Sequence, residues 1–415
     1  MAGVSAFLSQ PVRATSLPVL SNPSALPELG DFRAEAWRGA PDRVRVGQAR
    51  DGIWWWITAE GAPTVVRGVQ GVRHLDGSSG QGRLVELEEW GFNLLGPDST
   101  AGFAARGIPH LESLELRRAE HPLIHVGAAQ LPDVYDLRWP AVCAARVAAV
   151  NAGPGLAGYL SDRQLGWAQP ALDGSAPTRP TLLQLCLSLD PRFSAYHAAW
   201  EFVLAPRGGD WDALNRAWSL SLPNKETLRQ QTLEEQPIWT AGYRLDHARF
   251  TREFAQRYFR GAAAAVRQAD PGRLFFGAPV AGALPAEIRE AAVAQVDVLL
   301  TDDLPPGSLA GPVMIVDYNW TCFADAPGGG GERHLSRLER MHHFGRAALQ
   351  ELLEHPTVVG YVWGTYAAGE RATEAPFGGG LYYADGSIAH EYVEPLAALN
   401  AIASQIHAGG GAGDA

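Results

Sequence analysis

The sequence contains few cysteines, no block of basic residues and no long apolar run, and each absence narrows what the chain can be. Its three cysteines, Cys143, Cys186 and Cys322, are far apart and form no CxxC pair, which argues against a disulfide framework and a zinc site. The formal net charge of −11, without Lys/Arg clusters, predicts that nucleic acid is not a partner. The sequence has no run of about 18 consecutive apolar residues, so we expect no membrane-spanning helix.

Several sequence motifs are also missing. No glycine fingerprint opens a strand–helix unit, and the run Gly328–Gly331 is not followed by Lys-Ser/Thr, so neither a dinucleotide site nor a phosphate loop is predicted. No Gly-Xaa-Ser-Xaa-Gly elbow indicates a serine hydrolase. We therefore expect no cofactor and no metal. The first ten residues lack the basic and apolar regions of a signal peptide, which predicts a cytoplasmic location.

Composition and periodicity divide the chain into an arm, a large domain and a tail. Residues 1–40 are rich in Pro, Ser and Ala and predict an N-terminal arm, and residues 408–415 predict a flexible tail. Between them, 41–407 is long enough for one large barrel. Residues 168–245 carry four tryptophans and short helical patches, which indicates a helical insertion on the rim of that barrel.

Eight short apolar runs, most of them followed by a helical pattern, predict an α/β fold of the (β/α)₈ type, a closed parallel barrel. A hairpin at 43–69, including Ile53–Ile57, leads into the first barrel strand and predicts a short N-terminal extension. We place the eight strands at 64–69, 91–96, 107–109 with 122–127, 156–167, 274–279, 296–301, 312–320 and 357–363. The clearest helical period lies at 246–269, and Ser336 and Glu339 have the form of a capping box at the start of another helix.

The run Leu156–Trp167 changes abruptly from apolar to charged residues, as a buried parallel strand does at its carboxyl end. It resembles a strand of the agarase-type glycoside hydrolases and related clan A (β/α)₈ enzymes, where the sequence is roughly Gly-Tyr-Phe-Xaa-Asp-Asn-Glu-Leu-Xaa-Trp. The resemblance extends from about Trp54 to Asn400, and implies the barrel fold and a carbohydrate ligand. It places the acid/base position on Gln164 and an Asn position on Arg163.

By the same resemblance the nucleophile position, normally Glu at the end of strand seven, falls on Asp317. A retaining glycosidase needs two carboxyl groups about 5 to 5.5 Å apart, one to donate a proton and one to attack the sugar. Gln164 is a neutral amide that cannot release a proton, and Asp317 is one methylene shorter than Glu. These departures predict a chain that binds a glycan and has lost retaining hydrolysis or keeps little of it.

An unconventional acid is the alternative to lost activity. Asp162 precedes Gln164 by two residues, so on a regular strand it would share a face with it and could pair with Asp317. The interpretation that we favour for Asp162 is a buried structural side chain, hydrogen-bonded to neighbouring backbone or to an arginine such as Arg67. Other substitute acids are Glu201, Glu370 and Glu374, which fall on predicted rim loops.

Five further residues are predicted to contact the oligo- or polysaccharide ligand: Asn93, Arg163, Tyr318, Trp320 and Trp363. For Trp363 the resemblance implies a stacking platform under a sugar ring. Three hypotheses follow: a glycan-binding hydrolase homologue, an active hydrolase that uses Asp317 with an unconventional acid, and a non-catalytic interaction barrel filled by Arg163. The sugar, the linkage and the oligomeric state are not predicted.

Overall fold

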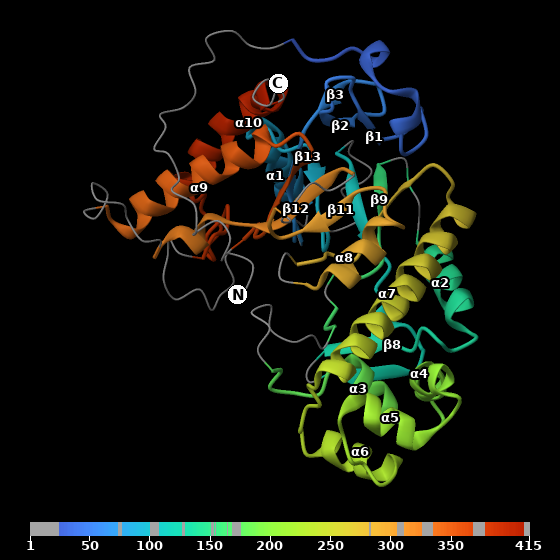
Figure 1. Ribbon diagram of the computed structural model, residues 1–415. Coiled ribbons are helices and arrows are strands. Elements are labelled where there is room, and N and C mark those ends of the chain that lie inside the picture. The colour runs from blue at the N-terminus through green and yellow to red at the C-terminus, as the bar shows by residue number, and fades with distance from the viewer. Residues whose placement is uncertain are drawn as a thin grey trace.

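The computed structural model describes residues 25–73, 77–99, 108–126, 129–150, 153, 155–163, 165–167, 176–281, 284–304, 311–325, 335–367 and 378–410. Its centre is one sheet of eight parallel strands (Figure 1). In chain order these are β4 (Val66–Val69), β5 (Leu94–Leu95), β6 (His110–Ser113), β9 (Leu156–Leu160), β10 (Leu274–Gly277), β11 (Leu299–Thr301), β12 (Val313–Tyr318) and β13 (Val358–Trp363).

The sheet curls into a barrel because each strand except β10 pairs with the next barrel strand in sequence, and β13 returns to pair with β4. The remaining gap lies between β10 and β11. Two backbone hydrogen bonds bridge it, from Asp297 N to Phe275 O (2.7 Å) and from Val280 N to Leu300 O (2.8 Å). The predicted (β/α)₈ barrel is thereby confirmed.

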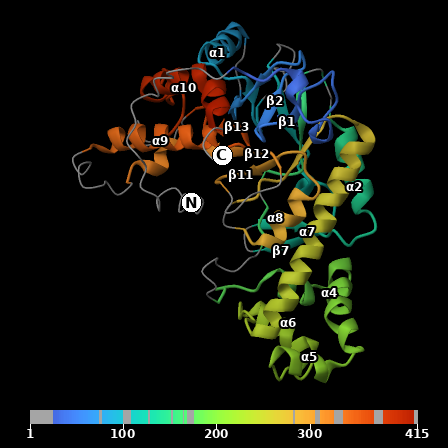
Figure 2. The ribbon, with the colours of Figure 1, turned by 45° about the horizontal axis from the view of Figure 1, so that its top comes forward.

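Among the residues that the structure describes, six helices form the outer layer of the barrel. They are α1 (Gly77–Glu89), α2 (Trp139–Ala148), α7 (Ala241–Ala269), α8 (Ala286–Val293), α9 (Arg337–Glu354) and α10 (His390–Gly410). Figure 2 shows α9 and α10 together on one flank, and α2, α7 and α8 on the other. Because α10 continues to Gly410, residues 408–410 are helical where we expected the start of a tail.

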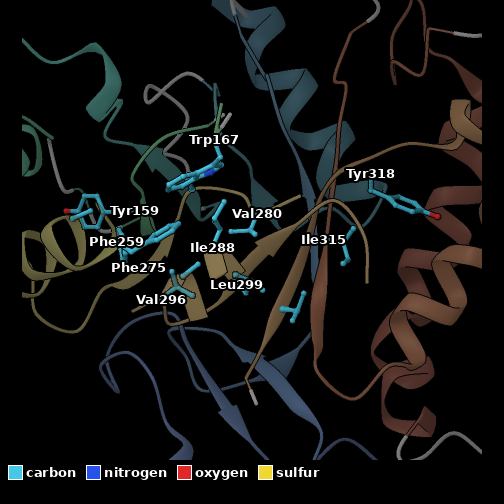
Figure 3. Close-up of a cluster of buried hydrophobic side chains, with 14 of the residues drawn as sticks. Tyr159, Trp167, Phe259, Phe275, Val280, Ile288, Val296, Leu299, Ile315 and Tyr318 are labelled. Carbon is cyan, nitrogen blue, oxygen red and sulfur yellow. The ribbon is translucent and has the colours of Figure 1, made fainter. Parts of the chain in front are cut away.

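Successive side chains of a strand point to opposite faces of the sheet, so the apolar residues of the strands form two separate cores. One set, including Val66, Leu111, Leu160 and Met314, forms a cluster inside the barrel. The other faces the helices, and Figure 3 shows part of it, with Phe275 and Leu299 from strands and Phe259 from α7. Every one of these residues is nearly inaccessible to solvent, so both faces of the sheet are buried.

A small antiparallel sheet covers the end at which the barrel strands begin. It consists of β1 (Arg45–Gln48), β2 (Trp54–Ile57) and β3 (Pro63–Thr64), the predicted hairpin extension. Trp54 and Trp56 belong to the interior core, and the Trp54 amide donates to Pro356 O just before β13 (2.7 Å). The sheet of β1–β3 therefore packs against the barrel interior at the amino ends of the strands.

The helical insertion lies between β9 and α7, as predicted. It comprises α3 (Leu182–Leu187), α4 (Ser194–Leu204), α5 (Trp211–Trp218) and α6 (Lys225–Leu233). Figure 1 shows these helices on the opposite side of the barrel from β1–β3, at the carboxyl ends of the strands. The following helix, α7, begins at Ala241 rather than 246, because the Thr240 side chain accepts from Tyr243 N and caps it there.

The third barrel strand differs from our assignment. Residues 107–109 and 122–127 were expected to form it, whereas β6 occupies His110–Ser113. The apolar run becomes β7 (Leu123–Val126), which pairs antiparallel with β8 (Ala129–Pro132) in a separate ribbon. This ribbon buries Ile124 and Leu131 in the outer core, so its apolar character reflects packing outside the barrel.

Candidate functional site

Polar side chains from distant parts of the chain meet at the carboxyl ends of the barrel strands. Gln70 follows β4, Asp98 follows β5, Arg163 follows β9, and Asp317 lies near the end of β12. Hydrogen bonds and ion pairs connect them in two groups: Gln70 with Asp317, and Arg163 with Asp98. Of the residues predicted for the site, Asp317 and Arg163 therefore do lie on this rim.

Asp317 occupies an irregularity in β12. Its φ is +55°, in the left-handed region, and the pairing of β12 with β13 shifts register between Ile315 and Tyr318. Such a bulge changes the direction of one side chain without displacing the rest of the strand. Val316 consequently remains in the barrel interior and Tyr318 in the outer core, while the Asp317 side chain is exposed.

The amide of Gln70 contacts the Asp317 carboxylate directly. Gln70 Nε2 donates to Asp317 Oδ1 (2.5 Å) and to the carbonyl of Gly364 (2.8 Å) just beyond β13. Gln70 itself is buried, with 7% of its surface exposed. The exposed carboxylate of Asp317 is therefore held by the buried side chain of Gln70, whose position is fixed by its packing in the barrel.

A network of ion pairs spans the rim beside Asp317. Arg163 pairs with Asp98, and Arg73 contacts the same carboxylate oxygen from a more exposed position (2.9 Å). Burial lowers the pKa of Arg163, and the negative charge of Asp317 opposes that shift. Since a guanidinium keeps its proton throughout the ordinary pH range, Arg163 supplies a permanent positive charge near Asp317.

Asp162 makes its contacts with the outer layer instead. Its Oδ2 accepts from the Tyr258 hydroxyl of α7 (2.6 Å) and its Oδ1 from the backbone amide of Arg117 (3.0 Å). The side chain is fully buried, and burial raises the pKa of Asp162 to about 7 in spite of these two donors. Strand β9 ends at Leu160, so the regular alternation that would align Asp162 with position 164 does not extend that far.

The three aromatic residues predicted to bind sugar are buried in the outer core. Trp363 is fully buried and its Nε1 donates to Gly379 O (2.8 Å), and Trp320 packs edge-on against it at 5.6 Å. The Tyr318 hydroxyl donates to Gly345 O in α9 (2.9 Å). Figure 3 shows the Tyr318 ring directed to the helices rather than to the barrel axis. A ring in such surroundings has no face open to a sugar.

Asn93 lies at the beginning of β5, one residue before it, and not at its carboxyl end. Its Oδ1 accepts from Arg67 N (2.8 Å) and its Nδ2 donates to Val65 O (2.9 Å). The side-chain amide thus satisfies one backbone group of β4 and one of the residue just before it. Satisfying buried backbone groups is a structural role that a polar residue at a strand end can have instead of contacting a ligand.

The remaining predicted residues divide between the surface and the part of the chain outside the described residues. Glu201 is exposed on α4. Gln164, Glu370 and Glu374 lie outside the described residues. Within the described part, no helix is long and apolar enough to span a membrane, and no three His, Cys, Asp or Glu side chains converge as metal ligands.

Sequence reasoning missed three rim residues: Arg73, Asp98 and the role of Gln70. Asp98 has a φ of +62°, which an Asp tolerates better than most residues but which no sequence pattern marks. Asp303, at the end of β11, was also left out of the site. Burial raises the pKa of Asp303 to about 6, and its Oδ1 accepts from Leu304 N (2.7 Å).

Comparisons with known proteins bear on the fold. No protein-family model matches the sequence, and no curated protein matches it. Among solved structures, an exo-β-agarase is similar at 16% identity and a TM-score of 0.67, covering 90% of this chain and 67% of its own. The agarase AgWH50C is similar at 16% identity and a TM-score of 0.67, covering 94% and 69%. A third structure, BpGH50, is similar at 17% identity and a TM-score of 0.60, covering 96% and 90%.

At these identities the likeness concerns the course of the backbone and not the chemistry of the site. It covers 90% to 96% of this chain. The chain therefore has the (β/α)₈ barrel fold of the agarase-type glycoside hydrolases, as its sequence motifs predicted.

Proposed function

We propose that this protein binds an oligo- or polysaccharide at the carboxyl ends of its barrel strands and has lost, or keeps little of, the retaining hydrolase activity of agarase-type enzymes. The observation that carries the proposal is the Asp317 carboxylate, which is exposed on the rim and held by Gln70. An oriented carboxylate beside a guanidinium offers both acceptors and donors to sugar hydroxyls. The agarases of like fold support a galactose-containing saccharide as the ligand class.

The residues around Asp317 favour binding over cleavage. Double displacement needs a proton donor as well as a nucleophile, and position 164, to which the sequence resemblance assigns that donor, holds a neutral amide. Asp162 is a poor substitute, since Tyr258 and the Arg117 amide engage both its oxygens on the side of the helices. Among the described residues, the hydrogen-bond partner of Asp317 is Gln70, and the nearby positive charge is that of Arg163, and neither side chain can supply the proton that cleavage needs.

A non-catalytic interaction barrel is the second candidate, and the ion pairs of Arg163 favour it. Arg163 and Arg73 both pair with the Asp98 carboxylate. These three charged groups of the rim therefore already have partners without any ligand. If this network only fills the rim, replacing Arg163 by Asn leaves saccharide binding absent. If the network contributes to a ligand site, the same replacement alters a measurable affinity.

Titration of the protein with galactose-containing oligosaccharides tests the proposal, with tryptophan fluorescence and calorimetry as readouts. We expect saturable binding that weakens at least tenfold in Asp317→Asn, because the charged acceptor is lost. Asp42→Asn, which removes an exposed carboxylate just before β1, is the matched control and should bind as the wild type does. Equal binding by Asp317→Asn, or none by the wild type, would contradict the proposal.

Cleavage is examined separately by the release of reducing ends from the same saccharides. The wild type should release none above the background. The triple variant Arg163→Asn, Gln164→Glu, Asp317→Glu restores the residues that the sequence resemblance implies, and should gain activity if the rest of the site is intact. Turnover by the wild type that disappears in Asp317→Asn would favour the active hydrolase instead.

A further inference from the structure

The orientation of the Gln70 amide follows from its neighbours. Its nitrogen lies 2.5 Å from Asp317 Oδ1 and 2.8 Å from the carbonyl oxygen of Gly364. Both of these atoms are acceptors, so the opposite orientation would place the amide oxygen against two other oxygens. Each of the two N–H groups of Gln70 therefore has one acceptor, and its full donor capacity is used.

Two glycines allow this close arrangement. A Cβ on Gly364 would lie 3.0 Å from the carbonyl carbon of Asp317 and 3.2 Å from its Cα, and a Cβ on Gly96 would lie 3.0 Å from the Cβ of Gln70. Distances this short require the backbone or the side chain to shift. Because Gly96 and Gly364 have no side chains, Gln70 and Asp317 can approach each other more closely than larger residues at these two positions would permit.

We propose that Gln70 is a positioning residue of the saccharide site: by holding Oδ1 of Asp317, it turns Oδ2 toward the ligand as the acceptor for a sugar hydroxyl. The inference rests on the proposed function and adds to it the polarity of the contact. Both Gln70 donors are thus occupied, and among the described residues no hydrogen bond reaches the two remaining oxygens, Gln70 Oε1 and Asp317 Oδ2, which are acceptors. The ligand must therefore donate, and a hydroxyl blocked by a methyl ether does not.

The lengths of the two side chains are matched to each other. Replacing Gln70 by Asn shortens the donor and replacing Asp317 by Glu lengthens the acceptor, and either change alone disturbs the contact. The double variant Gln70→Asn, Asp317→Glu contains the same number of methylene groups between the two backbones as the wild type. It can re-form the hydrogen bond at a shifted position, as no single variant can.

The experiment measures saccharide affinity for the wild type, Gln70→Leu, Gln70→Asn, Asp317→Glu and the double variant Gln70→Asn, Asp317→Glu. Each single variant should weaken binding about tenfold or more, since a misplaced charged acceptor loses most of its contact. The double variant should recover to within about threefold of the wild type. Gln48→Leu, which removes an amide from β1 at the other end of the barrel, is the control and should not change the affinity.

Mono-O-methyl saccharides provide the second readout, and their binding to the wild type does not depend on the folding of a variant. Methylation of one hydroxyl should weaken binding to the wild type and have little effect on binding to Asp317→Ala, which lacks the acceptor. The inference is overturned if the wild type binds while Gln70→Leu binds equally well, or if the double variant is no better than the singles. If the wild type itself binds no saccharide, the proposed function fails, and that result is distinct from either of these.

Discussion

Replacing Asp162 by Asn should remove a pH dependence of stability that the buried carboxyl imposes on the protein. Asn preserves the contacts of the neutral acid: its oxygen accepts from the Arg117 amide, and its nitrogen donates to the Tyr258 oxygen. The Ser161 hydroxyl, 2.9 Å from the Tyr258 oxygen, completes the cluster in both proteins. The substitution therefore eliminates the charge and leaves the packing nearly unchanged.

The size of the effect follows from the pKa of Asp162, which burial raises to about 7 in the folded protein. An unfolded Asp titrates near pH 3.9, so the folded state binds the proton more tightly by about 3 pKa units, on the order of 4 kcal/mol. Because the folded pKa is the higher one, this stability is fully present below pH 4. It is lost progressively as the pH rises to 7, where the buried side chain must ionise.

Urea unfolding of the wild type and of Asp162→Asn, measured at intervals from pH 4.5 to 8, isolates this contribution, since all other groups titrate alike in both proteins. The free energy of unfolding of Asp162→Asn should exceed that of the wild type by an amount that grows with pH and levels off above pH 7. Asp42→Asn should show no such trend. Parallel curves for wild type and Asp162→Asn would refute the reasoning, and a growing deficit in the variant would show that the charge is stabilised where it lies.

Three further predictions concern neighbouring contacts. Asn93→Ala should lower the free energy of unfolding by about 2 to 5 kcal/mol, because two backbone groups lose their hydrogen-bond partners. The saccharide affinity should not change, and a loss of affinity at full stability would instead place the Asn93 amide in the site. Tyr258→Phe should cost about 1.5 to 3 kcal/mol at pH 8 and less at pH 5, since the hydroxyl donates to an ionised Asp162 only at the higher pH; equal losses at both would contradict this. Gly364→Ala should weaken saccharide binding through the displaced Asp317 backbone, and unaltered affinity would argue against the tight packing seen there.

The barrel was predictable because its strands are buried on both faces and therefore appear as continuous apolar runs. The segments Val358–Trp363 and Val313–Tyr318 show this clearly, with almost every residue inaccessible to solvent. The third strand was not predictable by the same signal. Its sequence, His-Leu-Glu-Ser at 110–113, has one apolar residue, while the more apolar run at 123–126 forms a ribbon outside the barrel.

The location of Asp317 and Arg163 at the carboxyl ends of the strands was predictable, through the family resemblance and, for Arg163, through the change from apolar to charged residues after Leu160. The aromatic residues were harder to place. Strict alternation along β12 does not hold at Asp317, where a positive φ redirects one side chain and leaves Tyr318 facing the helices. Asp98 was missed for a related reason, since its place depends on a local backbone conformation and on partners distant in sequence.

Native mass spectrometry of the protein incubated with a galactose-containing oligosaccharide tests the central claim most directly. The account predicts a complex whose added mass is that of the intact saccharide, formed by the wild type and strongly reduced in Asp317→Asn, with no shortened saccharide in solution. Shortened products that require Asp317, or an adduct that Asp317→Asn forms equally well, would contradict it.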